Sequence, residues 1–203
     1  MASVLTGVDR KLLWSDFQAV ANAPAGAPEG AAAQTIPNHT ATGGVPHNVA
    51  ATGLAPIFMI PDNLVINVFL QNDSWRLDSV SNWTGAEQVW LIKHEQGHYD
   101  IHALLVRDFF VRIQAMIGQP FSDAAALQSQ LIDHRAATIG RIAGLQDDYD
   151  NDTANSRNGS EQWTWWNAIE RASQLHRVPL VTGADGRFLR LELIDALTAA
   201  GLA

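Results

Sequence analysis

The sequence predicts an α+β domain in which short strands and loops come first and an antiparallel pair of long helices follows. Residues 1–85 are rich in Gly, Pro, Ala, Asn and Thr, and Asn22–Gly53 is interrupted repeatedly by Pro and Gly, which exclude long helices. Leu64–Trp75 is apolar and β-branched before a turn-prone Asn-Asp-Ser, which predicts the best strand of the chain. Beyond it, apolar residues recur at three- and four-residue spacing, as on one face of a helix.

Two helices of this pattern form the expected hairpin. The first extends over Glu87–Ile117, with Gly118 and Pro120 as its stop signals. Ser122 is the expected cap of the second helix, whose apolar stripe persists to about Asp148. A connection of about two to five residues would make the two helices antiparallel neighbours.

The C-terminal part predicts a third helix over Ser160–Leu175, and then a strand or turn that leads to a terminal helix in "GRFLRLELIDALTAAGLA". We therefore expect one main domain over residues 1–178 and an accessory strand or helix over residues 179–203.

Composition excludes several classes of protein. The chain has 203 residues, of which 47% are hydrophobic and 17% charged, and no apolar run approaches the roughly 20 residues of a membrane span. Its net charge of −8 disfavours nucleic acid as a partner. The chain has no cysteine, so any metal must be bound by His, Asp or Glu. The first residues lack an apolar core long enough for a secretory signal.

The segment "KHEQGHYDIH" contains the clearest chemical motif. His94 and His98 are four residues apart on one helix face, so both imidazoles can reach a single Zn²⁺, and Glu95 can activate a water there. The alternative is a helix that carries two surface histidines by chance. Apolar residues on both sides of the motif predict that this stretch is packed in the core, which favours the metal site.

Other histidines are less suitable as ligands. His102 lies roughly 12 Å along the helix axis from His94, too far to share one zinc, so we expect a structural role or a contact behind the ligands. His134 lies about two turns beyond His98 when positions are mirrored across the hairpin turn. His39 and His47 lie in the loop region and are expected to be exposed.

The third ligand should come from the partner helix. Mirror counting about the turn places the acidic cluster "LQDDYDNDT" near the height of the two histidines, so Asp147, Asp148 and Asp150 are all candidates. Asp152 is a further alternative, because helix positions inferred from sequence err by about two to four residues.

Four segments, taken in order, resemble a bacterial family of predicted zinc-dependent proteases of unknown function: "LLWSDFQAV", "NDSW", "HEQGHYDI" and "YDNDTANSRNGSEQWTWW". The resemblance implies a zincin-like fold, zinc ligands at His94 and His98, and Glu95 as catalytic base. It singles out Asp150, in the family's Tyr-Asp pair with Tyr149, as the third ligand. It also implies a secreted, periplasmic or delivered protein.

One departure from the family pattern lies after the Tyr-Asp pair. The family has His-Gly where this chain has Asn155 and Ser156, which puts catalysis in question if that histidine binds metal or substrate. The tryptophans of "QWTWW" are expected to be core or helix-packing residues and are assigned no function.

The expected function is hydrolysis of peptide bonds in a peptide or protein substrate with one zinc. Glu95 would take a proton from water and deliver it to the leaving amine, and Tyr149 is a candidate donor to the oxyanion. The alternative is a non-catalytic binding module or a delivered toxin module that keeps the fold without turnover. Substrate specificity and oligomeric state are not encoded in any motif of the chain.

Overall fold

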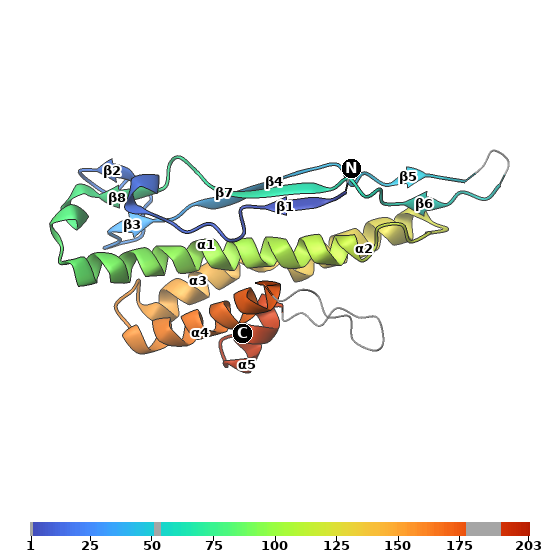
Figure 1. Ribbon diagram of the computed structural model, residues 1–203. Helices are drawn as coiled ribbons and strands as arrows, with labels where there is room; N and C mark the ends of the chain where they lie inside the picture. The colour runs from blue at the N-terminus through green and yellow to red at the C-terminus, as the bar shows by residue number, and fades with distance from the viewer. Residues whose placement is uncertain (1, 51–53, 178–191) are drawn as a thin grey trace.

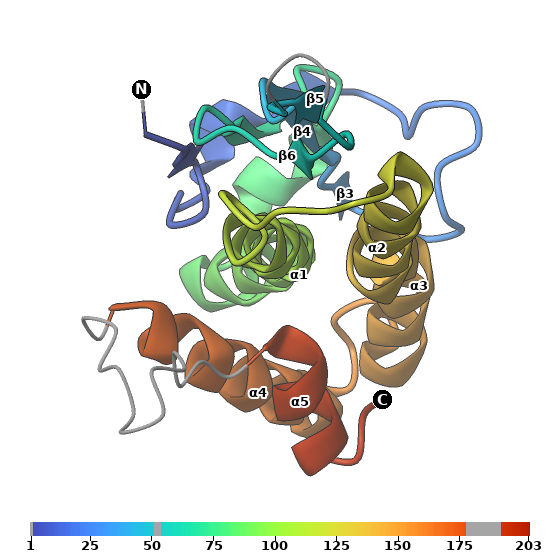
Figure 2. The same ribbon diagram turned by 90° about the vertical axis from the view of Figure 1, so that its right-hand side faces the viewer.

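Helix α1 (Gly85–Gln114) forms the centre of the molecule. A computed structural model describes residues 2–50, 54–177 and 192–203. The strands lie along one side of α1, and the other helices cover its opposite side and one flank (Figure 1, Figure 2). The described residues thus form a mixed α+β structure, as predicted.

The main sheet has β7 (Val65–Leu70) at its centre, with the order β1-β7-β4. β1 (Val4–Thr6) is parallel to β7, and β4 (Pro37–Thr42) is antiparallel to it. The side chains of Ile66, Val68 and Leu70 are buried and alternate with more exposed ones, so one face of the sheet packs on the core. The strand predicted within Leu64–Trp75 is confirmed.

The rest of the N-terminal part consists of short strands, 3-10 turns and loops, also as predicted. A second sheet has the order β2-β8-β3, in which β3 (Ala33–Gln34) is an edge strand beside α1. The remaining elements are β2 (Gln18–Val20), β8 (Trp75–Leu77), β5 (His47–Asn48), β6 (Phe58–Met59), η1 (Trp14–Asp16) and η2 (Asp78–Asn82).

Helix α1 begins and ends close to the predicted positions. Thr84 and Glu87 form a capping box, in which each side chain accepts a hydrogen bond from the other residue's backbone N–H. Every residue from Ile101 to Asp108 is buried, because strands or helices cover this stretch on several sides (Figure 2). A helix so enclosed provides a rigid base for the side chains of its preceding turns.

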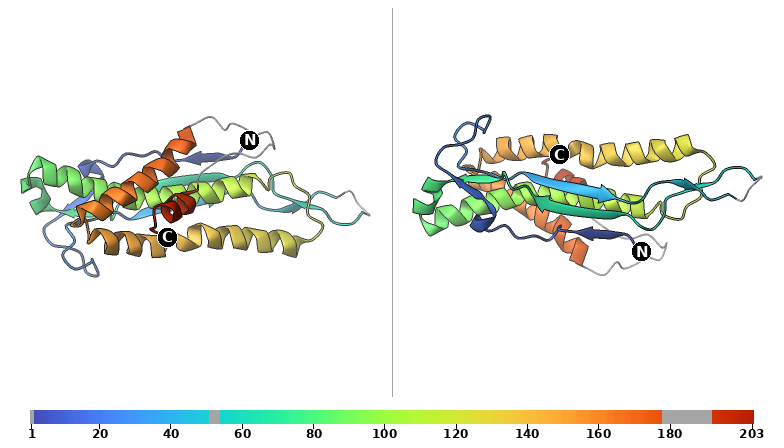
Figure 3. Two further views of the ribbon diagram at one scale, coloured as in Figure 1. Left: turned by 90° about the horizontal axis from the view of Figure 1, so that it is seen from below. Right: turned by 90° about the horizontal axis from the view of Figure 1, so that it is seen from above.

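The predicted second helix is wrong in detail, because the chain breaks it into α2 (Ala124–Ala137), a 3-10 turn η3 (Ile139–Arg141) and α3 (Ile142–Thr153). The break falls at Thr138, whose backbone is non-helical and whose hydroxyl donates to the carbonyl of His134. Asp123, not Ser122, caps α2 through a hydrogen bond from Ala125 N. The connection over residues 115–123 is longer than expected, and α2 and α3 run antiparallel to α1 (Figure 3).

Helices α4 (Gly159–Arg177) and α5 (Leu193–Ala199) complete the fold. The predicted third helix is confirmed, and the predicted strand or turn before the terminal helix lies mostly outside the described residues. Leu193 and Leu197 of α5 are fully buried, and Leu193 N donates to Asp108 of α1. None of the described helices has the length and apolar character needed to cross a membrane.

Candidate metal centre

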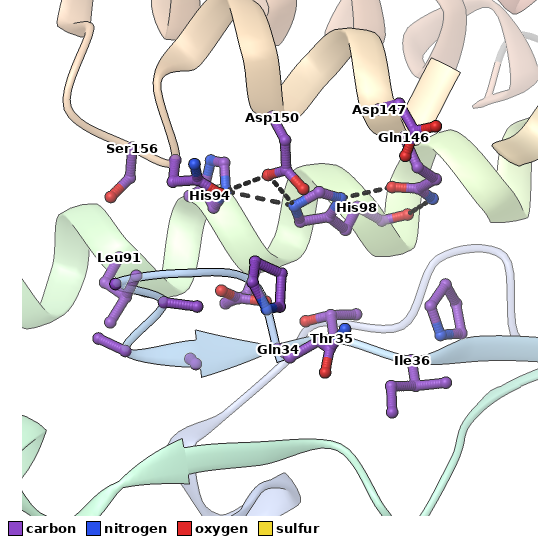
Figure 4. Close-up of a pocket in the computed structure, with 18 of the residues that line it drawn as sticks. Gln34, Thr35, Ile36, Leu91, His94, His98, Gln146, Asp147, Asp150 and Ser156 are labelled. Atoms are coloured by element: carbon purple, nitrogen blue, oxygen red, sulfur yellow. Dashed lines mark hydrogen bonds and ion pairs between the residues drawn. The ribbon is translucent and has the colours of Figure 1, made fainter. Parts of the chain in front are cut away.

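Helices α1 and α3 face each other with two side chains each. His94 and His98 lie one turn apart on α1, and Gln146 and Asp150 lie one turn apart on α3 (Figure 4). Leu145 and Tyr149 of α3 lie one turn apart and are buried, on a helix that packs against α1 and α4. Two facing turns of regular helix therefore hold all four polar side chains.

Three ligand atoms converge between these helices. Asp150 Oδ1 lies 3.2 Å from His94 Nε2 and 3.0 Å from His98 Nε2, and the two imidazole nitrogens are 3.2 Å apart. A triangle with such sides has its corners about 1.8 Å from its centre, whereas Zn–N and Zn–O bonds are about 2.0–2.2 Å. One ion can therefore reach all three atoms from just outside their plane, which leaves one side of the group open.

Gln146 fixes the orientation of His98. Its amide Nε2 donates to the His98 carbonyl at 2.9 Å, which turns its Oε1 toward His98 Nδ1. An amide oxygen can only accept, so Nδ1 carries the proton and Nε2 presents its lone pair to Asp150. In the neutral ring the lone pairs of His98 Nε2 and Asp150 Oδ1 would face each other at 3.0 Å, so either a second proton on Nε2 or a metal cation must lie between them. The donor set therefore fits a metal ion.

The pKa values show the same need for positive charge. Burial alone would lower the pKa of His98, but the hydrogen bond to Asp150 and the charge of Glu95 outweigh it and raise that pKa. Burial alone would raise the pKa of Asp150, but the hydrogen bonds with His94 and His98 hold it well below its usual range. Asp150 is thus an anion under all ordinary conditions, as a metal ligand must be.

Glu95 lies beside the triad, as we call His94, His98 and Asp150, without belonging to it. Its side chain is nearly inaccessible, with 2% of the residue exposed, yet it borders the cavity next to the histidines. Among the described residues its Oε2 has no hydrogen-bond partner. A buried carboxylate oxygen of this kind needs a donor from solvent or from a bound molecule.

The cavity is about 530 Å³ and runs along α1. Leu91, His94, Glu95, His98 and His102 form its wall on α1, at the spacing of one helix face. That wall extends about 16 Å along the helix axis, the length of about five residues of extended peptide.

An extended segment forms the opposite wall. Every residue from Ala31 to Pro37 borders the cavity, although alternate side chains of an extended segment point in opposite directions. The segment includes the edge strand β3, and Figure 4 shows Gln34, Thr35 and Ile36 across the cavity from the triad.

The turn after α3 forms the rim of the cavity. Ala154, Asn155 and Ser156 all have positive φ, at 48°, 51° and 72°, which is strained for residues other than glycine. Asn155 and Ser156 border the cavity. The positions at which the family pattern has His-Gly thus lie at the cavity, and Ser156 adopts a conformation that glycine would adopt without strain.

The structure brings together the three predicted ligands, His94, His98 and Asp150, with the predicted base Glu95. The alternatives Asp147 and Asp148 are exposed on α3, and Asp152 accepts a hydrogen bond from Trp165 Nε1 at 3.0 Å. His102 and His134 do not belong to the triad.

Other expectations need correction. His39 is not exposed: it lies on β4, half-buried, with its Nδ1 3.1 Å from Nε2 of His102. Burial, reinforced by His39, lowers the pKa of His102 to about 4. Of the tryptophans in "QWTWW" only Trp165 is fully buried, and Trp163 is exposed.

Tyr149 is placed behind the ligands instead of in the cavity. It is fully buried, its ring stacks on His94 with centroids 4.8 Å apart, and its hydroxyl donates to the His94 carbonyl. Burial raises the pKa of this hydroxyl far above its usual range. These contacts do not support Tyr149 as a donor to an oxyanion.

Sequence reasoning missed Gln146 and the 31–37 segment. The only signal for Gln146 is its position one helical turn before Asp150.

Comparison of the chain with models of protein families, with curated proteins and with solved structures gave no match.

Proposed function

We propose that this protein is a zinc-dependent peptidase of the zincin-like type. The observation that supports this best is the convergence of His94, His98 and Asp150 within hydrogen-bonding distance, with the unpartnered carboxylate oxygen of Glu95 on the same cavity. Two histidines and one carboxylate leave a fourth position open, as catalytic zinc sites do.

The chain would supply the following chemistry. Bound zinc would polarise the scissile carbonyl and increase the acidity of a water molecule. Glu95 would accept the proton of the attacking water and deliver it to the departing amine nitrogen. Because Glu95 is not needed as a ligand, it is free for proton transfer, and its burial keeps the carboxylate fixed beside the reacting atoms.

The shape of the cavity supports a peptide as substrate. The 31–37 segment borders the cavity along its whole length, and β3 is an edge strand whose outer side can pair with an added strand. A substrate held in this way would lie extended along α1 and bring one peptide bond to the triad.

The test combines metal analysis with a cleavage assay. Purified protein should bind one zinc per chain and cleave members of a mixed peptide library. Glu95→Gln should keep zinc and fold but lose cleavage by at least about 100-fold, as expected for loss of general acid–base catalysis. Asp148→Asn removes an exposed carboxylate of α3 and should behave as wild type. Equal cleavage by wild type and Glu95→Gln would contradict the assigned base.

A second function is favoured by one observation: Asn155 occupies the cavity position at which the resembling family has histidine. A protein that binds metal and peptide without turnover would bind zinc stoichiometrically and cleave no library peptide. Asn155→His should then restore cleavage if this position alone is limiting.

A further inference from the structure

A second cavity of about 360 Å³ opens beside the one that contains the triad, at the N-terminal end of α1. We refer to it as the side pocket. Its lining residues are Trp83, Ala86, Glu87, Trp90, Leu91 and Ser156. Trp83, Leu91 and Ser156 also line the main cavity, so the two cavities are direct neighbours.

The wall of the side pocket is held rigidly. The indole N–H of Trp90 donates to the Ser156 carbonyl at 2.7 Å, and its ring packs edge-on against Trp166 with centroids 5.0 Å apart. The strained turn that ends at Ser156 is what brings this carbonyl to α1. The pocket therefore exists before any ligand binds.

The chemistry of the side pocket is apolar. Two indole rings, a leucine and an alanine supply most of its lining. Its one carboxylate, that of Glu87, is held by the backbone N–H and the hydroxyl of Thr84 and serves as a cap. Trp83 is 37% exposed, which leaves an aromatic face for another apolar group to cover.

Position on α1 relates the side pocket to the triad. Trp90 precedes His94 by about 6 Å along the helix axis, and an extended peptide advances about 3.3 Å per residue. A side chain in the pocket would therefore belong to a residue about two positions from the bond at the triad.

We propose that the side pocket binds a large apolar side chain, aromatic or long aliphatic, of the substrate peptide, within two residues of the scissile bond. This inference rests on the proposed function, because the side chain is taken to belong to a peptide substrate. It adds specificity, which neither the zinc ligands nor Glu95 provides.

Cleavage specificity is the first test. The zinc-loaded protein should cleave a mixed library with a preference for Phe, Leu or Met at one position within two residues of the cut. Trp83→Ala removes one wall, and Ala86→Phe fills the pocket from an exposed position on the first turn of α1. Each should lower kcat/KM for a Phe-containing peptide roughly 10- to 100-fold relative to its Ala counterpart.

Ala125→Phe is the matched control, because Ala125 is the exposed second residue of α2 as Ala86 is of α1. It should keep the preference of the wild type. If both pocket variants also keep that preference, or if the wild type shows none at any position near the cut, the inference is overturned.

A binding measurement tests the side pocket without relying on activity. N-acetyl-phenylalaninamide should shift the indole ¹H–¹⁵N resonances of Trp83 and Trp90 in the metal-free and the zinc-loaded protein, whereas N-acetyl-alaninamide should not. Ala86→Phe should abolish the shift, and Ala125→Phe should keep it. Absence of the shift in wild type overturns the inference, even if peptides are cleaved. A shift without any cleavage supports the pocket and counts against the peptidase.

Discussion

Gly97, inside the HEQGH motif, is the position at which the smallest substitution should do the most damage. A Cβ atom added there would lie 2.3 Å from the hydroxyl oxygen of Tyr149 and 2.6 and 2.9 Å from two of its ring carbons. Tyr149 cannot withdraw easily, because it is fully buried between His94, Trp165 and the indole N–H of Trp166. We therefore expect Gly97→Ala to push α3 away from α1.

The expected change in the free energy of unfolding of Gly97→Ala follows from two opposing effects. Replacing glycine by alanine within a helix gains up to about 1 kcal/mol, whereas forcing a methyl group into a packed core costs about 1–3 kcal/mol. Gly144, inside α3, is the matched control, since a Cβ there meets no atom within 4 Å. The propensity gain cancels between the two variants, so Gly97→Ala should be about 1–3 kcal/mol less stable than Gly144→Ala.

Urea unfolding of the metal-free protein in EDTA measures this difference without a contribution from bound zinc. Zinc affinity, measured separately, should fall in Gly97→Ala alone, because Asp150 moves with α3. A double-mutant cycle with Tyr149→Ala locates the cause: once the ring is gone, Gly97→Ala should no longer destabilise. Equal stability of Gly97→Ala and Gly144→Ala would refute the reasoning.

Three further predictions concern the triad and its surroundings. Asp150→Ala should abolish stoichiometric zinc binding while Asp148→Ala keeps it, as followed by metal analysis after dialysis; the reverse result would identify a different ligand. Gln146→Ala should weaken zinc about 10- to 100-fold by freeing the His98 ring, and Gln146→Glu, which keeps an acceptor, should recover part of the loss; unchanged affinity in both would exclude a positioning role. His102→Gln should keep zinc and reduce the loss of stability on acidification, which thermal unfolding at stepped pH can follow. Because the pKa of His102 is about 4 in the folded protein and about 6.5 in the unfolded chain, its contribution is present above pH 6.5 and is lost as the pH falls toward 4; identical pH profiles would count against this assignment.

The sequence allowed the correct prediction of those features that depend on local periodicity. Val65–Leu70 is rich in apolar and β-branched residues, and apolar residues recur every three or four positions through α1. Each pattern lies within one segment, and the structure contains both the strand and the helix that these patterns predict. His94 and His98 needed only the geometry of one helix to be placed together. Mirror counting brought only the acidic cluster near the motif, and the family resemblance singled out Asp150 within it.

The errors lie where tertiary contacts override local patterns. Mirror counting assumed a short turn and one unbroken helix, whereas the chain has a break at Thr138 and a longer connection, so it could not single out one residue of the acidic cluster. His39 was expected in solvent because it lies in the Pro- and Gly-rich region interpreted as loop, yet pairing of β4 with β7 places it against His102. No local pattern encodes a contact between two elements so distant in the chain.

The Gly97–Tyr149 contact also explains what fixes the distances between the two histidines and Asp150. A tyrosine ring seated on a glycine sets the distance between α1 and α3, and the same ring stacks on His94. Because His94 and His98 on α1 face Gln146 and Asp150 on α3, that one distance determines whether both histidines reach the carboxylate. His94 is 3% exposed at the base of the site, whereas the Asp150 side chain is 31% exposed toward the cavity. The site is therefore rigid on its buried side and open on the side that faces the cavity, and its geometry depends on the packing of α1 against α3.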